Sequence, residues 1–306
     1  LLMAYRAAGH LGLQCASKFI LLAEECGHRN FRKVRGNLKL KSCLLDDPLV
    51  RIEIDSSSSF LVYELDEFQE KFVGPILKTS IIEDLVVGCR RAIRHHNGLL
   101  NMQSIDISVA WRIVTAYYCS FFAATEICRL YGRFPIQLDV DDFQRIRSKV
   151  NASEVDNGFF TQTQQGFFGM VTESGIRFVS SGQRPHAFLW TNFAPVLREI
   201  YKDRDWVDAL NLLEIVTSSK NPSTIRNEWN YKFADRFGTT GDQIGHAFPK
   251  LIGNDSSVAA WLSHEDWQRR GDSAIAESIA ALCETTNLGL KEAVSRVDNA
   301  TAVDFS

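Results

Sequence analysis

The stretch that most constrains the fold is residues 113–125, IVTAYYCSFFAAT, which carries no charged side chain and lies between Arg112 and Glu126. Thirteen residues are too few to cross a bilayer, because a transmembrane helix needs about 20. An uncharged stretch of this length is typical of a helix buried in a protein core. The segment therefore predicts a buried helix at about 107–131 and a protein without a membrane partner.

Two other regions alternate apolar and polar residues, as strands with one solvated face do. The first region comprises 37–42, 50–55 and 60–65, for which we expect a small antiparallel sheet. The second comprises 166–171 and 176–179, which predict a β-hairpin.

Helical periods dominate the rest of the chain from Pro75 onward. The expected fold class is therefore mainly α (α+β). Residues 1–74 are expected to form an N-terminal helix with the small sheet. Residues 75–306 are expected to form a helical domain with the hairpin inserted at about 158–180.

The cysteine content favours a cytoplasmic protein with reduced thiols, and the net charge bears on binding to nucleic acid. The formal net charge of −3 argues against a surface generally coated by nucleic acid, although a local basic cleft is compatible with it. The seven cysteines are odd in number, scattered and without a CxxC pair, so neither a disulfide framework nor a zinc ribbon is indicated. The first residues show no charged region or cleavage site of a secretory signal. We expect no metal and no cofactor.

The predicted helix 107–131 has one face of small residues that begins near Arg112 and ends near Glu126. Another helix could approach closely there. Two interpretations stay open. The helix is either a core element whose two charges mark its ends, or Arg112 and Glu126 frame a functional cleft.

Residues 223–234, STIRNEWNYKFA, place an arginine beside an apolar stripe. Ile225, Trp229 and Phe233 recur every four residues and define the buried side of a helix predicted to run from 222 to 237. Arg226 lies about 20° from Phe233 on a helical wheel. A guanidinium at this margin is costly without an acidic partner or an anion.

The segments 108–132 (SVAWRIVTAYYCSFFAATEICRLYG) and 225–231 (IRNEWNY) resemble two helices of HEPN proteins. The first is similar to their tyrosine-rich helix, and the second to their later helix that carries an arginine. HEPN domains are helical and often dimeric. Many are metal-independent ribonucleases of toxin–antitoxin, phage-defence and CRISPR-linked systems, whereas others only bind partners. The resemblance covers about 40 of the 306 residues.

The sequence departs from the pattern of active HEPN proteins, in which a histidine follows the arginine after four to six residues. Tyr231 and Phe233 stand at those positions after Arg226. Arginine can still stabilise charge on a phosphorane, but tyrosine, with a reference pKa near 10, is a poor base at neutral pH. The resemblance implies a cleaving site formed by the following side chains: Arg226, Asn227, Asn230, Tyr231, Arg112 and Glu126.

The segment 89–98, CRRAIRHHNG, fits the arginine–histidine spacing twice. Its basic residues favour phosphate contacts with RNA, and they are Arg90, Arg91, Arg94, His95 and His96. A plainer interpretation is that they offset the macrodipole at the end of a helix predicted for 76–96. They could hold RNA while another helix performs the chemistry.

We therefore expect an RNA-binding or RNA-cleaving effector of a bacterial toxin or anti-phage system, metal-independent if active. The alternative is a non-catalytic assembly or scaffold subunit of a defence complex. A nucleotide-sensing module that uses the basic segment 89–98 is a third interpretation. The expected partners are RNA and a second copy of the chain or a larger protein complex.

Overall fold

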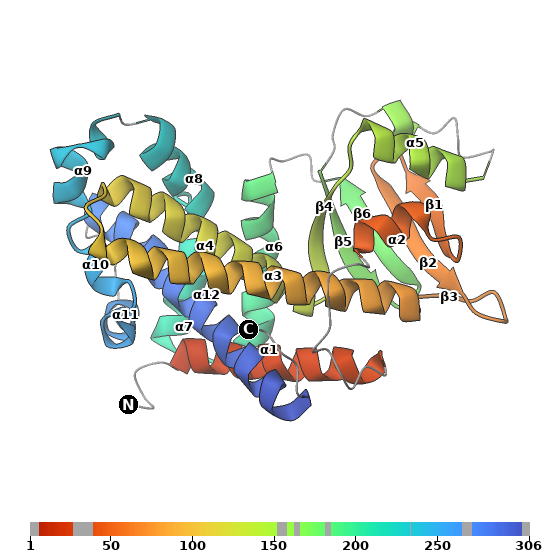
Figure 1. Cartoon of the computed structure of the whole chain (residues 1–306), viewed down its shortest axis with the longest axis horizontal. Helices are drawn as coiled ribbons and strands as arrows, with labels where there is room; N and C mark the ends of the chain where they lie inside the picture. Colours follow the sequence, from red (N-terminus) through yellow and green to blue (C-terminus); the bar gives the residue numbers. More distant parts are fainter. Residues whose placement is uncertain are drawn as a thin grey trace.

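Figure 1 shows a lobe of helices beside a lobe built on one sheet, with helix α3 (Pro75–Asn101) running through both. The computed structural model describes residues 6–26, 39–151, 158–161, 166–180, 185–232, 234–264 and 271–301. The fold is mainly α with an antiparallel sheet, as the sequence predicts.

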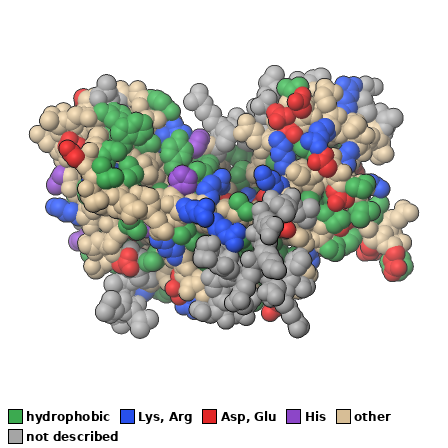
Figure 2. Space-filling model, viewed as in Figure 1, with side chains coloured by type: hydrophobic (Ala, Val, Ile, Leu, Met, Phe, Trp, Pro, Cys, Tyr) green, Lys and Arg blue, Asp and Glu red, His purple; other side chains and the backbone are tan. Residues whose placement is uncertain are grey.

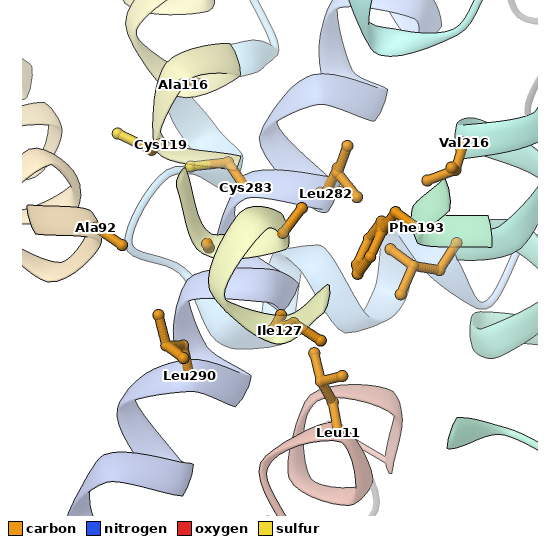
Figure 3. Packing of buried hydrophobic residues seen from close by; sticks show 14 of the residues in the cluster. Leu11, Ala92, Ala116, Cys119, Ile127, Phe193, Val216, Leu282, Cys283 and Leu290 are labelled. Atoms are coloured by element: carbon orange, nitrogen blue, oxygen red, sulfur yellow. The ribbon is translucent and has the colours of Figure 1, made fainter. Parts of the chain in front are cut away.

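Helix α4 (Val109–Leu130) is the central element of the helical lobe. It is the buried helix predicted from the uncharged segment, and that prediction is confirmed. Figure 3 shows side chains of neighbouring helices meeting around it. These helices are α1 (Arg6–Glu25), α3, α6 (Pro185–Ile200), α7 (Val207–Thr217) and α12 (Asp272–Thr301). Shorter segments complete the lobe: α8 (Pro222–Asn227), η5 (Glu228–Lys232), η6 (Ala234–Phe237), α9 (Thr239–Ile244), α10 (Phe248–Leu251) and α11 (Asp255–Leu262).

The strands form one antiparallel sheet in the order β1-β2-β6-β5-β4, with β3 also paired to β2. Their bounds are β1 (Val50–Ser56), β2 (Ser59–Leu65), β3 (Lys71–Phe72), β4 (Arg133–Gln137), β5 (Gly166–Thr172) and β6 (Gly175–Ser180). The two regions predicted as separate β additions are therefore joined. The joint is the β2–β6 pair, in which Phe60 lies opposite Phe178 and Val62 opposite Ile176.

The sheet lobe has its own apolar core. Phe60 and Phe178 stack with ring centroids 4.9 Å apart, and side chains of α2 (Leu40–Asp46) and α5 (Val140–Lys149) pack against the same cluster. The predicted strand at 37–42 is wrong for the residues that the structure describes, because Leu40 begins α2. Leu40, Cys43 and Leu44 are all buried, and this i, i+3, i+4 spacing is that of a helix face.

The predicted boundary at residue 74 does not separate the two lobes. Helix α1 packs along α12, where Gly12 leaves room for the Glu292 side chain, so the N-terminal helix belongs to the helical lobe. Conversely, β4, β5 and β6 belong with the N-terminal strands. Helix α3 ties the lobes together, since Leu77 lies in the sheet core and Leu85 in the helical core.

Helix α3 also continues past Asn97-Gly98, where the sequence predicts its end, and reaches Asn101. Its N-terminus is held by a carboxylate of the sheet, because the Leu77 N–H donates to Glu64 Oε1 at 2.9 Å.

Among the described residues, no helix has both the length and the apolar character that a bilayer span requires.

Candidate functional site

The candidate site centres on Arg226, in the last turn of α8. The Asn221 side chain accepts the Thr224 N–H at the start of this helix, and Pro222 occupies its first turn. The predicted single helix 222–237 is interrupted, because α8 passes into a π-helical turn, η5, and then into the 3-10 turn η6. Phe233 lies outside the described residues. Single π-helical turns inside helices are frequent at functional sites.

Arg226 is buried with 8% of its surface exposed, as the wheel predicts. Its Nη1 donates to Asn227 Oδ1 at 2.8 Å, and its Nε has no acceptor. No ion pair joins the guanidinium to a carboxylate anywhere in the described part of the chain. A buried cation without a counter-charge is costly in an apolar interior. Among the described residues the guanidinium therefore keeps an unpaired donor, Nε, and an uncompensated positive charge, which an anion could satisfy.

Three tyrosine rings surround the Arg226 guanidinium. Its Cζ lies 5.4 Å from the ring centre of Tyr117, 5.6 Å from Tyr118 and 5.7 Å from Tyr231. Ring quadrupoles attract a cation at these distances, but they do not neutralise it. Tyr117 and Tyr118 come from α4, whereas Tyr231 comes from the π-helical turn and is 71% exposed.

His186, in the first turn of α6, completes the site, and the sequence analysis did not identify it. Its Nδ1 lies 2.9 Å from the Tyr117 hydroxyl, and its ring lies 5.9 Å from Tyr118. The same two tyrosines that contact Arg226 therefore also contact an imidazole. No local pattern marks His186, because it precedes Arg226 by 40 residues and shares Tyr117 and Tyr118 with it only through the packing of α6 and α8 on α4.

The electrostatics of the site keep both His186 and Tyr117 neutral near pH 7. Burial lowers the pKa of His186, and the nearby positive charge of Arg226 lowers it further. Burial raises the pKa of Tyr117 to about 12, against the opposing influence of Trp190, Arg226 and Ser223. A neutral imidazole can accept a proton, whereas a neutral phenol can hold the imidazole in one orientation.

The residues predicted to act with Arg226 are brought together only in part. Asn227 and Tyr231 contact the guanidinium. Asn230 is half-buried on the same turn, and no hydrogen bond joins it to Arg226 among the described residues.

Arg112 and Glu126 do not frame a shared cleft with Arg226. Arg112 donates from Nη2 to the Ile105 carbonyl at 2.7 Å. The small-residue face between the two charges is filled by neighbouring helices, and Figure 3 shows Cys119 of that face beside Cys283 of α12. Of the two interpretations left open by the sequence, the core element is the one that the structure supports.

Glu126 belongs to a separate buried network between α3 and α4. Arg129 Nε donates to Glu126 Oε2 at 2.9 Å, and Arg91 Nη2 lies 3.6 Å from Glu126 Oε1. Burial raises the pKa of Glu126 although both arginines oppose the rise. The carboxylate lies against Gly88, whose missing side chain makes room for it.

The basic residues of α3 form a second candidate site, which we call the α3 groove. It is a hollow of ≈ 500 Å³ lined by Val87, Arg90, Arg91, Arg94 and His95. Figure 2 shows Lys and Arg side chains gathered on this face between the two lobes. The macrodipole interpretation loses its basis, because α3 extends to Asn101 and its last turn holds no basic residue.

Phe122 of α4 holds two side chains of the α3 groove. Arg91 Cζ lies 4.3 Å from the Phe122 ring centre, and the ring of His95 lies 4.8 Å from it. Arg91 is therefore shared between this ring and the Glu126 carboxylate.

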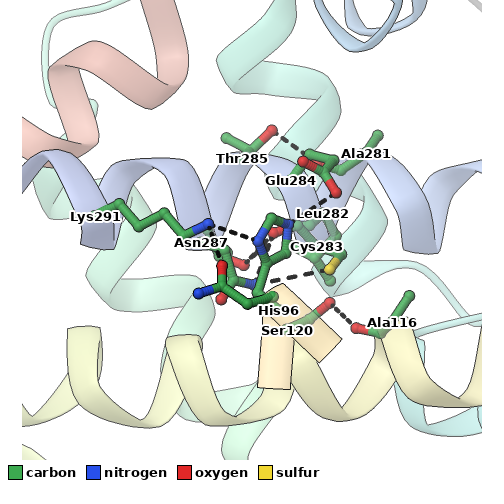
Figure 4. A network of polar contacts seen from close by, with 12 residues as sticks. His96, Ala116, Ser120, Ala281, Leu282, Cys283, Glu284, Thr285, Asn287 and Lys291 are labelled. Atoms are coloured by element: carbon green, nitrogen blue, oxygen red, sulfur yellow. Dashed lines mark hydrogen bonds and ion pairs between the residues drawn. The ribbon is translucent and has the colours of Figure 1, made fainter. Parts of the chain in front are cut away.

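His96 is not part of the α3 groove, because one residue along a helix turns the side chain by about 100°. It is 4% exposed and lies in the polar network of Figure 4, with Nε2 at 2.9 Å from Glu284 Oε1 and Nδ1 at 2.9 Å from Lys291 Nζ. His96, Cys283 and Glu284 offer ligand atoms within 4.8 Å of one another, a grouping that could hold a metal ion. The Lys291 ammonium on Nδ1 satisfies the imidazole without one, because Nε2–H then donates to Glu284.

The chain matches no model of a protein family, no curated protein and no solved structure.

Proposed function

We propose that this protein is a divergent HEPN-like effector that binds RNA and cleaves it without a metal ion at the Arg226–His186 site. The observation that carries the proposal is the buried guanidinium of Arg226, which has no carboxylate partner among the described residues, beside an imidazole kept neutral. A phosphate is the anion that suits a planar guanidinium with several donors. The resemblance of α4 and α8 to HEPN helices agrees with RNA as the source of that phosphate.

The roles of the residues follow from their positions. Arg226 binds the scissile phosphate and stabilises the charge that develops on it, with Asn227 fixing the guanidinium through the 2.8 Å bond. His186 accepts the proton of the ribose 2′-hydroxyl, and the 2′-oxygen attacks the phosphorus. The bond to the 5′-oxygen breaks, the 5′-oxygen takes a proton from water, and His186 returns its proton to the solvent. The products are a 2′,3′-cyclic phosphate and a 5′-hydroxyl.

Tyr117 orients His186, the general base, in this scheme. With Nδ1–H donated to the Tyr117 oxygen across 2.9 Å, Nε2 carries the free lone pair that the reaction needs. The histidine that active HEPN proteins place after their arginine is thus replaced in the proposal by one from another helix, α6.

Incubation of purified protein with end-labelled RNA in excess EDTA tests the proposal. We expect cleavage by the wild type, and a loss of about 100-fold or more in Arg226→Met and His186→Gln, which is the usual effect of removing a preorganised donor or base. Arg147→Met is the control, because Arg147 is an exposed arginine of the sheet lobe that also lies over a ring, Phe160. Cleavage that EDTA abolishes, or that survives in Arg226→Met, contradicts the proposal.

RNA that is bound but never cut supports the alternative of a non-catalytic module. The feature that favours this alternative is Tyr231, which stands where active HEPN proteins have a histidine. The cytoplasmic location and assembly with a second copy or a larger complex stay predictions.

A further inference from the structure

The α3 groove and the Arg226 site are joined by a continuous row of aromatic side chains on α4. Phe122 contacts Arg91 and His95 at the groove, and its ring lies 6.3 Å from that of Tyr118. Tyr118 in turn faces Arg226 and His186. The half-buried rings of Tyr118 and Phe122 therefore lie between two cationic sites on different helices.

From this arrangement we infer that the RNA is single-stranded and lies along one track, with its flanking phosphates in the α3 groove and one phosphate at Arg226. The inference rests on the proposed function and names its substrate more closely. Cations that follow a backbone, with aromatic rings between them, are the features by which proteins hold single strands.

The burial of Arg226 favours single-stranded RNA over a duplex as the substrate. With 8% of its surface exposed, the guanidinium meets only a phosphate that is inserted between Tyr118, Tyr231 and His186. Base pairing fixes both strands of a duplex in the double helix. A nucleotide of either strand can therefore enter such a site only if its base pair is broken. Tyr231, 71% exposed beside the guanidinium, offers a ring on which the base of the inserted nucleotide stacks.

The residues of the α3 groove and the neighbouring Phe122 have different roles. Arg94 and His95 are exposed and face outward, where they contact phosphates. Phe122 is a positioning residue that holds Arg91 and His95 in place. Arg91 also stabilises the buried Glu126, so a charge reversal at Arg91 would disturb the fold. Arg94 is the better position for a test.

Fluorescence anisotropy with an oligonucleotide whose 2′-hydroxyls are all methylated measures the track without cleavage. We expect the wild type to bind this single strand at least tenfold more tightly than a hairpin duplex of the same composition. Arg94→Glu should weaken single-strand binding by about tenfold and reduce the slope of log K against log salt by about 0.7, the value for one lost phosphate contact. Arg147→Glu, an exposed arginine over Phe160, should leave binding unchanged.

A second measurement separates the track from the cleavage chemistry. Arg94→Glu should cleave a dinucleotide at the wild-type rate, because its single internucleotide phosphate is bound at Arg226 and none is left for the α3 groove. The KM of Arg94→Glu for a longer RNA should rise. If the wild type binds the single strand selectively but cleaves nothing, the track stands and the proposed function fails. Equal affinity for single strand and duplex, or equal binding by wild type and Arg94→Glu, overturns the inference.

Discussion

The hydroxyl of Tyr117 lies 2.9 Å from Nδ1 of His186, and this contact joins the central helix α4 to the first turn of α6. It is the one hydrogen bond found for the His186 ring among the described residues. The rest of the ring lies against aromatic neighbours, of which Phe121 is at 4.6 Å. The orientation of the imidazole thus depends on a single phenol.

Tyr117→Phe should therefore impair cleavage more than folding. We expect kcat to fall by about tenfold with KM unchanged, because the imidazole loses the partner that selects its tautomer. The free energy of unfolding should fall by about 1 kcal/mol, the net contribution of one hydrogen bond. Tyr118→Phe is the control, since it keeps the ring that lies over Arg226. Steady-state kinetics and urea unfolding measure the two effects, and equal loss of kcat in both variants would contradict this role.

The pH dependence of stability should report His186. Because its pKa in the folded protein is lowered below the reference value of 6.5, the unfolded chain binds more protons between the two pKa values. The stabilising contribution of neutral His186 is complete above pH 6.5 and is lost as the pH falls toward the lowered pKa. Urea unfolding of the two proteins from pH 5 to 8 should therefore show that the free energy of unfolding of the wild type, relative to that of His186→Gln, rises with pH. Parallel curves for the two proteins would mean that the pKa of His186 is not lowered.

Arg226→Met should change the free energy of unfolding by no more than about 1 kcal/mol, because a buried cation without a counter-charge contributes little to the fold. Loss of its contacts with three tyrosines is offset by removal of its desolvation cost. Arg129→Met is the matched comparison in the same lobe. Arg129 is 9% exposed and pairs with Glu126 and Asp84, so its loss leaves a buried carboxylate and should cost about 3–5 kcal/mol. A similar loss in both variants would assign Arg226 a structural role.

The sequence predicts the burial of Arg226 but not the presence of His186 in the same site. Burial follows from the four-residue period of Ile225 and Trp229, which is a local property of one helix. That His186 reaches the same two tyrosines depends on how α6 and α8 pack on α4, and no spacing along the chain records that. At the fixed distances after Arg226 where a histidine is expected, the sequence has Tyr231 and Phe233 instead.

The sheet shows the same division between local and non-local information. Alternation predicts the strands at 50–55 and 60–65 and the hairpin at 166–179, and the structure confirms each of them. The pairing of Phe60 with Phe178 is not predicted, because alternation specifies the faces of a strand but not its neighbour. The strand predicted at 37–42 is wrong for the described residues because so short a window can alternate as a strand does and still contain the start of a helix, here Leu40 of α2.

Two glycines of α3 should respond oppositely to alanine, and they test the buried network of Glu126. A methyl group on Gly88 would overlap the Glu126 carboxylate, which has no room to move because it is 1% exposed and held by Arg129. Gly88→Ala should lower the free energy of unfolding by about 1–3 kcal/mol, the range for overpacking a core. Gly98 has no atom within 4 Å of such a methyl group, so Gly98→Ala should raise the free energy of unfolding by about 0.8–1.0 kcal/mol through helix propensity. Urea unfolding of both variants checks the pair. Stabilisation by Gly88→Ala would show that Glu126 does not lie against α3, and destabilisation by Gly98→Ala would show that α3 ends before residue 98.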